Sequence, residues 1–186
     1  MGHGVRVVKR PLSRFLFVIV LLLLLPAVPC AEDAAIRDLM VTNNTNHVLV
    51  YARVTNCFTP DIEAAILAGV PTTFTFIVEL FQERSGWLDR KVTRTNISHL
   101  MKYDNVKKLF HVYLDGDKEP TSFQDFEGAK RLMADLNGVP VAQLQELQQN
   151  EHYYVRIKAK LDKVRLPLRM EVVFFFVSLW DFETDW

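Results

Sequence analysis

Residues 69–90 read GVPTTFTFIVELFQERSGWLDR, a pattern that predicts one long strand followed by a turn. Alternate positions in its first half form an unbroken apolar row, made of Phe74, Phe76, Val78 and Leu80. The positions between them are mixed, and a period of two is typical of a β-strand with one dry face. Burying four such side chains stabilises the fold by roughly 1.5–3 kcal/mol each. We therefore expect a central strand over residues 72–82.

Further segments with a period of two lie on both sides of this strand. Strands are expected at residues 36–43, 47–56, 88–96, 106–114 and 153–161. Charges on both faces of residues 88–96 suit an edge strand. A short strand that runs into a helical turn is predicted over residues 139–149. Residues 172–179 are continuously apolar and are most simply a doubly buried strand, with a helix on the membrane surface as the alternative.

Two short helices are predicted in the longer connections. Residues 59–61, Thr-Pro-Asp, supply an N-cap, a first-turn proline and an early acid, so a helix follows over residues 62–68. Residues 122–125, Ser-Phe-Gln-Asp, resemble a capping box, and apolar residues recur at helical spacing over 126–136. The Asn-Gly pair at 137–138 is expected to end this second helix.

These elements add up to about seven strands with one or two inserted short helices. Most strands are joined by short turns, which implies antiparallel pairing, and the chain does not alternate strands with long helices. The expected fold class is therefore mainly β, an antiparallel β-sandwich of about seven strands. A curled sheet packed on the helix at residues 126–136 is the alternative.

The first thirty residues are predicted to form a targeting segment that stands apart from the fold. Four basic residues precede an uninterrupted apolar run of eleven residues at 15–25. This layout is typical of a secretory signal peptide, because a transmembrane helix needs about twenty apolar residues. We expect residues 1–30 to be removed, with retention as an N-terminal membrane anchor as the alternative. Residues 31–186 are then expected to form a single β-sandwich-like domain.

Charge and cysteine usage narrow the class of protein. Four of the 22 basic residues and none of the 22 acidic residues precede Cys30, so the rest of the chain carries a net charge of about −4. A mildly acidic body lacks the basic patch that nucleic-acid binding requires. The basic N-terminus is expected to stay in the cytoplasm while the body is exported. Cys57 is expected to be a small buried residue, because two cysteines do not make a disulfide scaffold.

The sequence contains no motif whose residues have a known catalytic role. It has no nucleophile elbow, no phosphate-binding glycine loop and no paired cysteines at metal spacing. No two of the five histidines share a spacing that would place them on one face as ligands. We expect no enzyme activity, no cofactor and no metal. The alternate acids Asp181, Glu183 and Asp185 could hold a hard cation, but solvated carboxylates are the simpler interpretation.

Aromatic residues provide the candidate site. Thirteen phenylalanines can fill the core, whereas tryptophans near the end of the chain are typical of partner or membrane-interface surfaces. Trp180, Phe182 and Trp186 are therefore predicted to contact a partner or the headgroup region. Such residues indicate a non-enzymatic binding or accessory protein that acts through protein contacts. A carrier or sensor that holds an apolar ligand between its sheets is the alternative.

Four stretches carry a resemblance to a known family. They are residues 65–90, 100–113, 153–168 and the tail WDFETDW at 180–186. With these stretches the chain resembles a family of bacterial envelope proteins known only as a domain of unknown function. The resemblance implies an N-terminal signal or anchor and a β-rich domain that is exported to the periplasm, secreted or tethered to the inner membrane. It brings no reaction and no site residues. Because an exported binding module acts through contacts, we expect an envelope protein as its partner.

Overall fold

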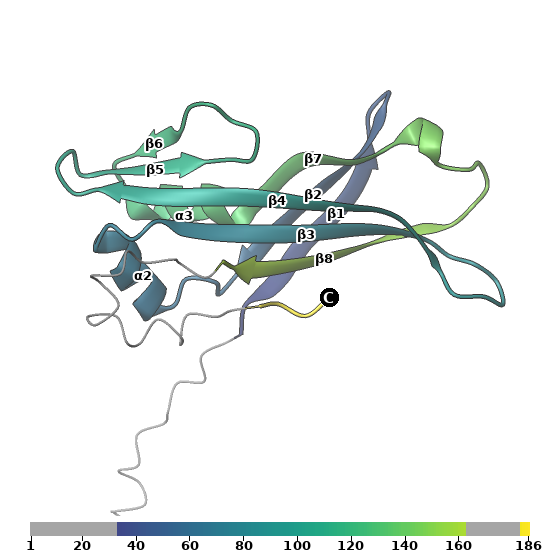
Figure 1. Ribbon diagram of the computed structural model, residues 1–186, viewed down its shortest axis with the longest axis horizontal. Helices are drawn as coiled ribbons and strands as arrows, with labels where there is room; N and C mark the ends of the chain where they lie inside the picture. Colours follow the sequence, from purple (N-terminus) through teal and green to yellow (C-terminus); the bar gives the residue numbers. More distant parts are fainter. Residues whose placement is uncertain (1–32, 163–182) are drawn as a thin grey trace, which may run out of the picture. The chain divides into compact units, whose positions relative to one another are not determined.

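The computed structural model describes residues 33–162 and 183–186, in which Figure 1 shows two antiparallel sheets. The small sheet has the strand order β1-β2-β7, and the large sheet has the order β6-β5-β4-β3-β8. The strands are β1 (Ala35–Asn43), β2 (His47–Thr55), β3 (Thr72–Gln82), β4 (Arg90–Asp104), β5 (Leu109–Tyr113), β6 (Thr121–Phe123), β7 (Asp135–Gln143) and β8 (Tyr153–Leu161). The predicted segments at 1–30 and 172–179 lie outside the described residues.

Strand β3 is an interior strand of the large sheet, as its alternating pattern predicts. It pairs with β4 along one edge and with β8 along the other. Its apolar row is fully buried, with Phe74, Phe76 and Val78 at 0% exposure and Leu80 at 2%. This row faces the small sheet, so both edges and one face of β3 are covered by other elements.

The opposite face of β3 is more buried than its mixture of polar and apolar residues predicts. Ile77 and the polar residue Glu79 are only 8% and 3% exposed. The Glu79 carboxylate accepts hydrogen bonds from Lys91 Nζ at 2.6 Å and from Arg94 Nη1 at 3.4 Å. A buried carboxylate is tolerated only when it is paired in this way. The pairing arises because Glu79 lies directly opposite Arg94 in the β3–β4 register.

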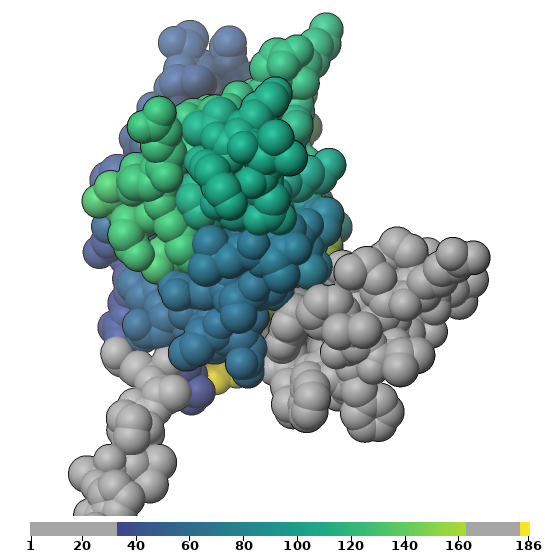
Figure 2. Space-filling model, turned by 90° about the vertical axis from the view of Figure 1, so that its left-hand side faces the viewer, coloured from purple at the N-terminus to yellow at the C-terminus, as the bar shows by residue number. Residues whose placement is uncertain are grey.

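The core lies between the two sheets and confirms the β-sandwich expectation. The inward row of β2 meets the inward row of β3, and strands β1, β2 and β7 cross behind the large sheet at an angle (Figure 1). Aromatic rings fill one end: Phe58 lies 5.2 Å from Phe74, and Phe110 stacks on Phe126 with centroids 4.7 Å apart. Figure 2 shows this end of the described segments from outside. The described core is packed with aliphatic and aromatic side chains.

Helix α2 (Pro60–Leu67) forms where the Thr-Pro-Asp signal predicts it. The Thr59 hydroxyl accepts from Ile62 N at 3.4 Å, and Pro60 occupies the first turn. Gly69 follows the helix with φ +87°, a conformation that glycine adopts without strain. Lys130 of the second helix joins the two helices by an ion pair of 2.7 Å to Glu63.

Helix α3 (Phe126–Ala134) starts later and ends earlier than the sequence predicts. Its N-cap is Asp125, whose carboxylate accepts from Gly128 N at 2.6 Å. The predicted cap, Ser122, lies in β6 and hydrogen-bonds to His111 Nδ1 at 2.8 Å. The capping-box prediction was therefore wrong by one turn, because an aspartate at position 125 can cap a helix as well as a serine can.

The predicted helix end at residues 137–138 is instead a bulge inside β7. Val50 pairs with Val139 and Ala52 pairs with Leu136, so Asn137 and Gly138 together oppose Tyr51. Gly138 has φ +68°, and a Cβ built on it would lie 3.0 Å from Tyr51 Oη. Pairing with β2 prevails over the turn-forming tendency of Asn-Gly, and the glycine supplies the bulge conformation. The remaining expectation for 139–149 is confirmed, since β7 leads into the 3-10 turn Leu144–Glu146.

Strand β4 is longer and more central than the edge strand predicted at 88–96. It runs for 15 residues between β3 and β5. The edge prediction still describes part of it, because β5 pairs only with residues 100–104. The expected strand at 106–114 is shorter, since the Asp104 carboxylate accepts from Val106 N and Lys107 N at 2.9 Å and forms a turn there. Residues 90–99 of β4 consequently have one open edge within the large sheet.

Replacing Gly138 by alanine is expected to lower the free energy of unfolding more than replacing Gly116. Both glycines have positive φ, +68° and +83°, so each alanine costs about 1 kcal/mol in backbone strain. Only the alanine at position 138 also meets Tyr51, whereas a Cβ at Gly116 has no neighbour within 4 Å. Urea unfolding of the two variants measures the difference, and equal losses would contradict the close approach of β7 to Tyr51.

Candidate binding surfaces

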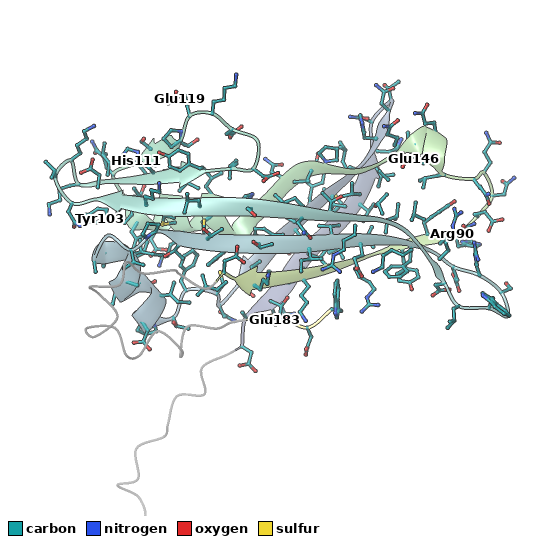
Figure 3. The ribbon with its side chains drawn as sticks, viewed as in Figure 1. Arg90, Tyr103, His111, Glu119, Glu146 and Glu183 are labelled. Carbon is teal, nitrogen blue, oxygen red and sulfur yellow. The ribbon has the colours of Figure 1, made fainter. Side chains whose placement is uncertain are left out.

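The C-terminal tail places Trp186 against the outer face of β8. The Thr184 amide donates to Ala159 O at 2.9 Å, and its hydroxyl accepts from Ala159 N at 3.0 Å. Figure 3 shows Glu183 beside this strand, where its carboxylate pairs with Lys158. The tail therefore continues the large sheet beyond β8.

Trp186 lies on basic side chains. Its ring is 4.7 Å from the Arg156 guanidinium and 5.4 Å from Lys158 Nζ, and 47% of the residue is exposed. Cation–π contacts of this kind hold an indole at a surface. Trp180 and Phe182, which were predicted to act with it, lie outside the described residues. The described part of the predicted site is thus one half-exposed aromatic ring that lies on Arg156 and on Lys158, whose charge is paired with Glu183.

A second surface is the free edge of the small sheet. Among the described strands β1 pairs only with β2, and three consecutive apolar residues on it are about half exposed: Leu39 46%, Met40 55% and Val41 47%. Unpaired backbone groups on such an edge can pair with a strand from another chain. The sequence predicts the strand at 36–43 but not its open edge, because strand order is a property of the tertiary fold.

A third surface is a groove between the sheets. It has a volume of about 760 Å³ and lies between the β4 residues 95–99, the turn after β5 and the bulged part of β7. We call it the acidic groove, and its charged and titratable lining consists of Asp38, Arg53, His99, Asp115, Asp117 and Asp135. These residues are far apart in sequence, so no local motif could have revealed the groove.

Two of the four aspartates in the acidic groove share one counter-ion, Arg53. Arg53 donates to both carboxylate oxygens of Asp135, at 2.7 and 3.2 Å, and lies 3.6 Å from Asp38. Asp115 and Asp117 lie on the exposed turn after β5, and their carboxylates have no partner among the described residues. The groove therefore has an excess of negative charge on the side of this turn.

His99 forms part of the floor of the acidic groove. The residue is 3% exposed, its ring lies 5.0 Å from the Phe76 ring, and Nδ1 is 3.0 Å from the Met133 carbonyl oxygen. Burial lowers the pKa of His99 below its usual value, although the Met133 carbonyl and nearby aspartates oppose this shift. We therefore take His99 as neutral near pH 7. No reason to single it out among the five histidines was visible in the sequence.

The described residues contain no nucleophile paired with His99 and no cluster of metal ligands. No serine, threonine or cysteine side chain there hydrogen-bonds to His99, and no three acidic, histidine or cysteine side chains come together as metal ligands. Cys57 is 2% exposed, as predicted, and burial raises the pKa of its thiol to about 12. A thiol with such a pKa is a poor nucleophile.

The fold and these surfaces define a filled β-sandwich with open strand edges. The chain belongs to a family described as a domain of unknown function, DUF4390, whose model matches residues 31–186. No curated protein and no solved structure matches it. Neither helix in the described part of the chain is long and apolar enough to cross a bilayer.

The stability of the protein is expected to fall as the pH drops below about 6.5, the pKa of an unperturbed histidine. The folded state binds a proton on His99 less readily than the unfolded state, because His99 is buried. The contribution of His99 is therefore complete above the unfolded pKa and decreases as the pH falls through it. Urea unfolding between about pH 7 and about pH 5 measures this dependence.

The variant His99→Gln should show a weaker pH dependence than the wild type. His152→Gln removes an exposed imidazole and is the matched control. An unchanged pH dependence in His99→Gln would mean that the burial of this imidazole does not control acid stability.

Proposed function

We propose that the protein is a non-enzymatic binding module of the bacterial cell envelope that acts through protein contacts. Its location is inferred from residues 1–30, whose basic start and apolar run are typical of a secretory signal or an uncleaved inner-membrane anchor. The acidic body of the chain and the resemblance to envelope proteins support the same location. The domain is thus placed in the periplasm, free or tethered to the inner membrane.

The observation that carries this proposal is the exposed apolar edge of β1. An extended segment of an envelope protein adds to this edge as a further strand and covers Leu39, Met40 and Val41. In this recognition mode, main-chain hydrogen bonds supply affinity and alternate side-chain contacts supply specificity. A monomeric domain has no structural need for three adjacent half-exposed apolar residues on a free edge.

The magnitude of apolar burial shows what the partner must provide. Covering the exposed halves of three side chains is worth about 1 kcal/mol each, or about 3 kcal/mol together. Association costs at least about 4 kcal/mol in lost translational and rotational freedom. Hydrogen bonds along the open edge must therefore contribute, which favours an extended partner segment over a globular surface.

The tail residues Trp180, Phe182 and Trp186 form a second proposed contact. The basic side chains under Trp186 suit an acidic partner surface or anionic headgroups. The alternative function, a carrier with an apolar ligand between its sheets, is less well supported, because the described core is packed and the groove between the sheets is lined by four aspartates. The packed phenylalanines therefore favour surface contacts over internal storage.

Photo-crosslinking tests the β1 contact in the full chain. A benzoylphenylalanine at Met40 is expected to give a discrete protein adduct in intact cells, whereas the same group at Val106 is expected to give none. Val106 is a suitable control because it is also an exposed apolar residue, at 92%, in the turn between β4 and β5. The benzoylphenylalanine variant at position 40 should lose its adduct when it also carries Val41→Lys. The lysine places a charge where the partner strand would cover Val41.

Equal adduct yields at positions 40 and 106 would contradict recognition at the β1 edge. Location is checked in the same cells by the mass of the mature chain and by its accessibility to protease after the outer membrane is opened. A chain that remains in the cytoplasm would contradict the envelope part of the proposal.

A further inference from the structure

The acidic groove combines two unpaired aspartates with an unpaired imidazole nitrogen on its floor. We propose that this groove binds a lysine or arginine side chain carried by an extended peptide segment. The proposal goes beyond the β1 contact, since it assigns a second surface and the chemistry of its ligand.

One ring nitrogen of His99 is free to accept a hydrogen bond. The Met133 carbonyl can only accept, so Nδ1 must carry the proton and Nε2 must present a lone pair. Nε2 has no partner among the described residues. The described residues contain no fully buried side-chain nitrogen or oxygen without a hydrogen-bond partner, so Nε2 is accessible to solvent, and His99 lines the groove. A donor that enters the groove can therefore replace water at Nε2.

The acidic groove also carries negative charge without a counter-ion. Arg53 pairs with Asp135 and approaches Asp38, which leaves the carboxylates of Asp115 and Asp117 without a counter-ion among the described residues. The turn that carries them is held by a hydrogen bond of 3.1 Å from the Asp117 amide to the Leu114 carbonyl. A ligand with N–H donors and positive charge satisfies both these carboxylates and His99 Nε2.

The acidic groove also has apolar walls. Ile97, Leu132 and Leu136 line the same groove. Lysine and arginine have an apolar stem below a charged head, so they can cover such walls while the head reaches the carboxylates. A bare metal ion fits less well, because the described residues provide no set of three metal ligands.

The edge of β4 beside the groove can accept a ligand backbone. Among the described residues, 94–99 of β4 pair with no strand on this edge, since β5 begins its pairing at Leu100. One end is closed where Thr93 Oγ1 donates to Val141 O at 2.9 Å. The groove is flanked by residues 51–53 of β2 and by the β5–β6 loop, which rises at the top of Figure 1. An extended chain can therefore pair with β4 and direct a side chain down onto His99.

The test uses the full chain and an acetylated, amidated pentapeptide of alternating valine and lysine. A peptide with glutamate in place of lysine and the small diamine 1,5-diaminopentane are the comparison ligands. Fluorescence anisotropy of labelled peptides measures affinity, competition measures the diamine, and nuclear magnetic resonance of the His99 ring nitrogens reports binding at Nε2. We expect the lysine peptide to bind and to shift the Nε2 resonance, and the glutamate peptide not to bind.

Variants separate the groove from general surface charge. The double variant Asp115→Asn with Asp117→Asn should weaken binding of the lysine peptide by about tenfold for each charge-assisted hydrogen bond that the substitutions remove. The control double variant, Glu119→Gln with Glu146→Gln, removes the same charge from two exposed residues that do not line the groove (Figure 3). It should change the affinity less than about twofold.

Three results would overturn the proposal. They are the absence of lysine-peptide binding, equal weakening by the two double variants, and binding that leaves Nε2 of His99 unshifted. Equal affinity for the diamine and the peptide would overturn the assignment of an extended chain. None of these variants alters residues 39–41, so failure here is distinguishable from failure of the β1 contact.

Discussion

The structure depends on the burial of β3. Four of its side chains are removed from water against the small sheet, and both of its edges are hydrogen-bonded to other strands. At roughly 1.5–3 kcal/mol for each buried side chain, this row alone matches the net stability of a typical domain. The positions of β4 and β8 follow from pairing with β3, and the paired charge of Glu79 follows from the β4 register.

The described core between the sheets is packed with side chains. The aromatic rings between the sheets pack on one another, so the openings lie where strands lack neighbours: along β1 and along residues 90–99 of β4. These two edges differ in chemistry. The β1 edge is apolar, whereas the groove beside β4 is acidic, and the outer face of β8 is basic around Trp186. Such a distribution allows one small domain to contact several segments of different character.

Sequence patterns predict the elements that depend on neighbours along the chain. Alternation predicts β3 and β8, and Thr59 with Pro60 predicts the start of α2, since these signals act within a few residues. Patterns fail where a distant strand decides the outcome. The Asn-Gly pair at 137–138 becomes a bulge because β2 lies beside it, and the capping box fails because Ser122 pairs with β5.

The candidate sites also include some residues that the sequence reveals and others that only the tertiary fold reveals. Trp186 is visible in the sequence as an aromatic near the acidic tail, and the structure places it on Arg156. His99 carries no sequence signal, because its environment comes from Phe76, Met133 and a turn sixteen residues away. The open edge of β1 carries no sequence signal either, since strand order is set by the whole fold, whereas the charges on both faces of residues 88–96 do indicate the open edge of β4.

Native-state amide hydrogen exchange on the purified chain is the most direct test of the role of β3. The amides of Phe76 and Val78 are expected to exchange only through global unfolding, with an opening free energy equal to that from urea unfolding. The amides of Met40 and Val41 on the free β1 edge are expected to exchange through smaller openings. Exchange of the β3 amides as fast as those of β1 would contradict a fold organised around a doubly paired, buried central strand.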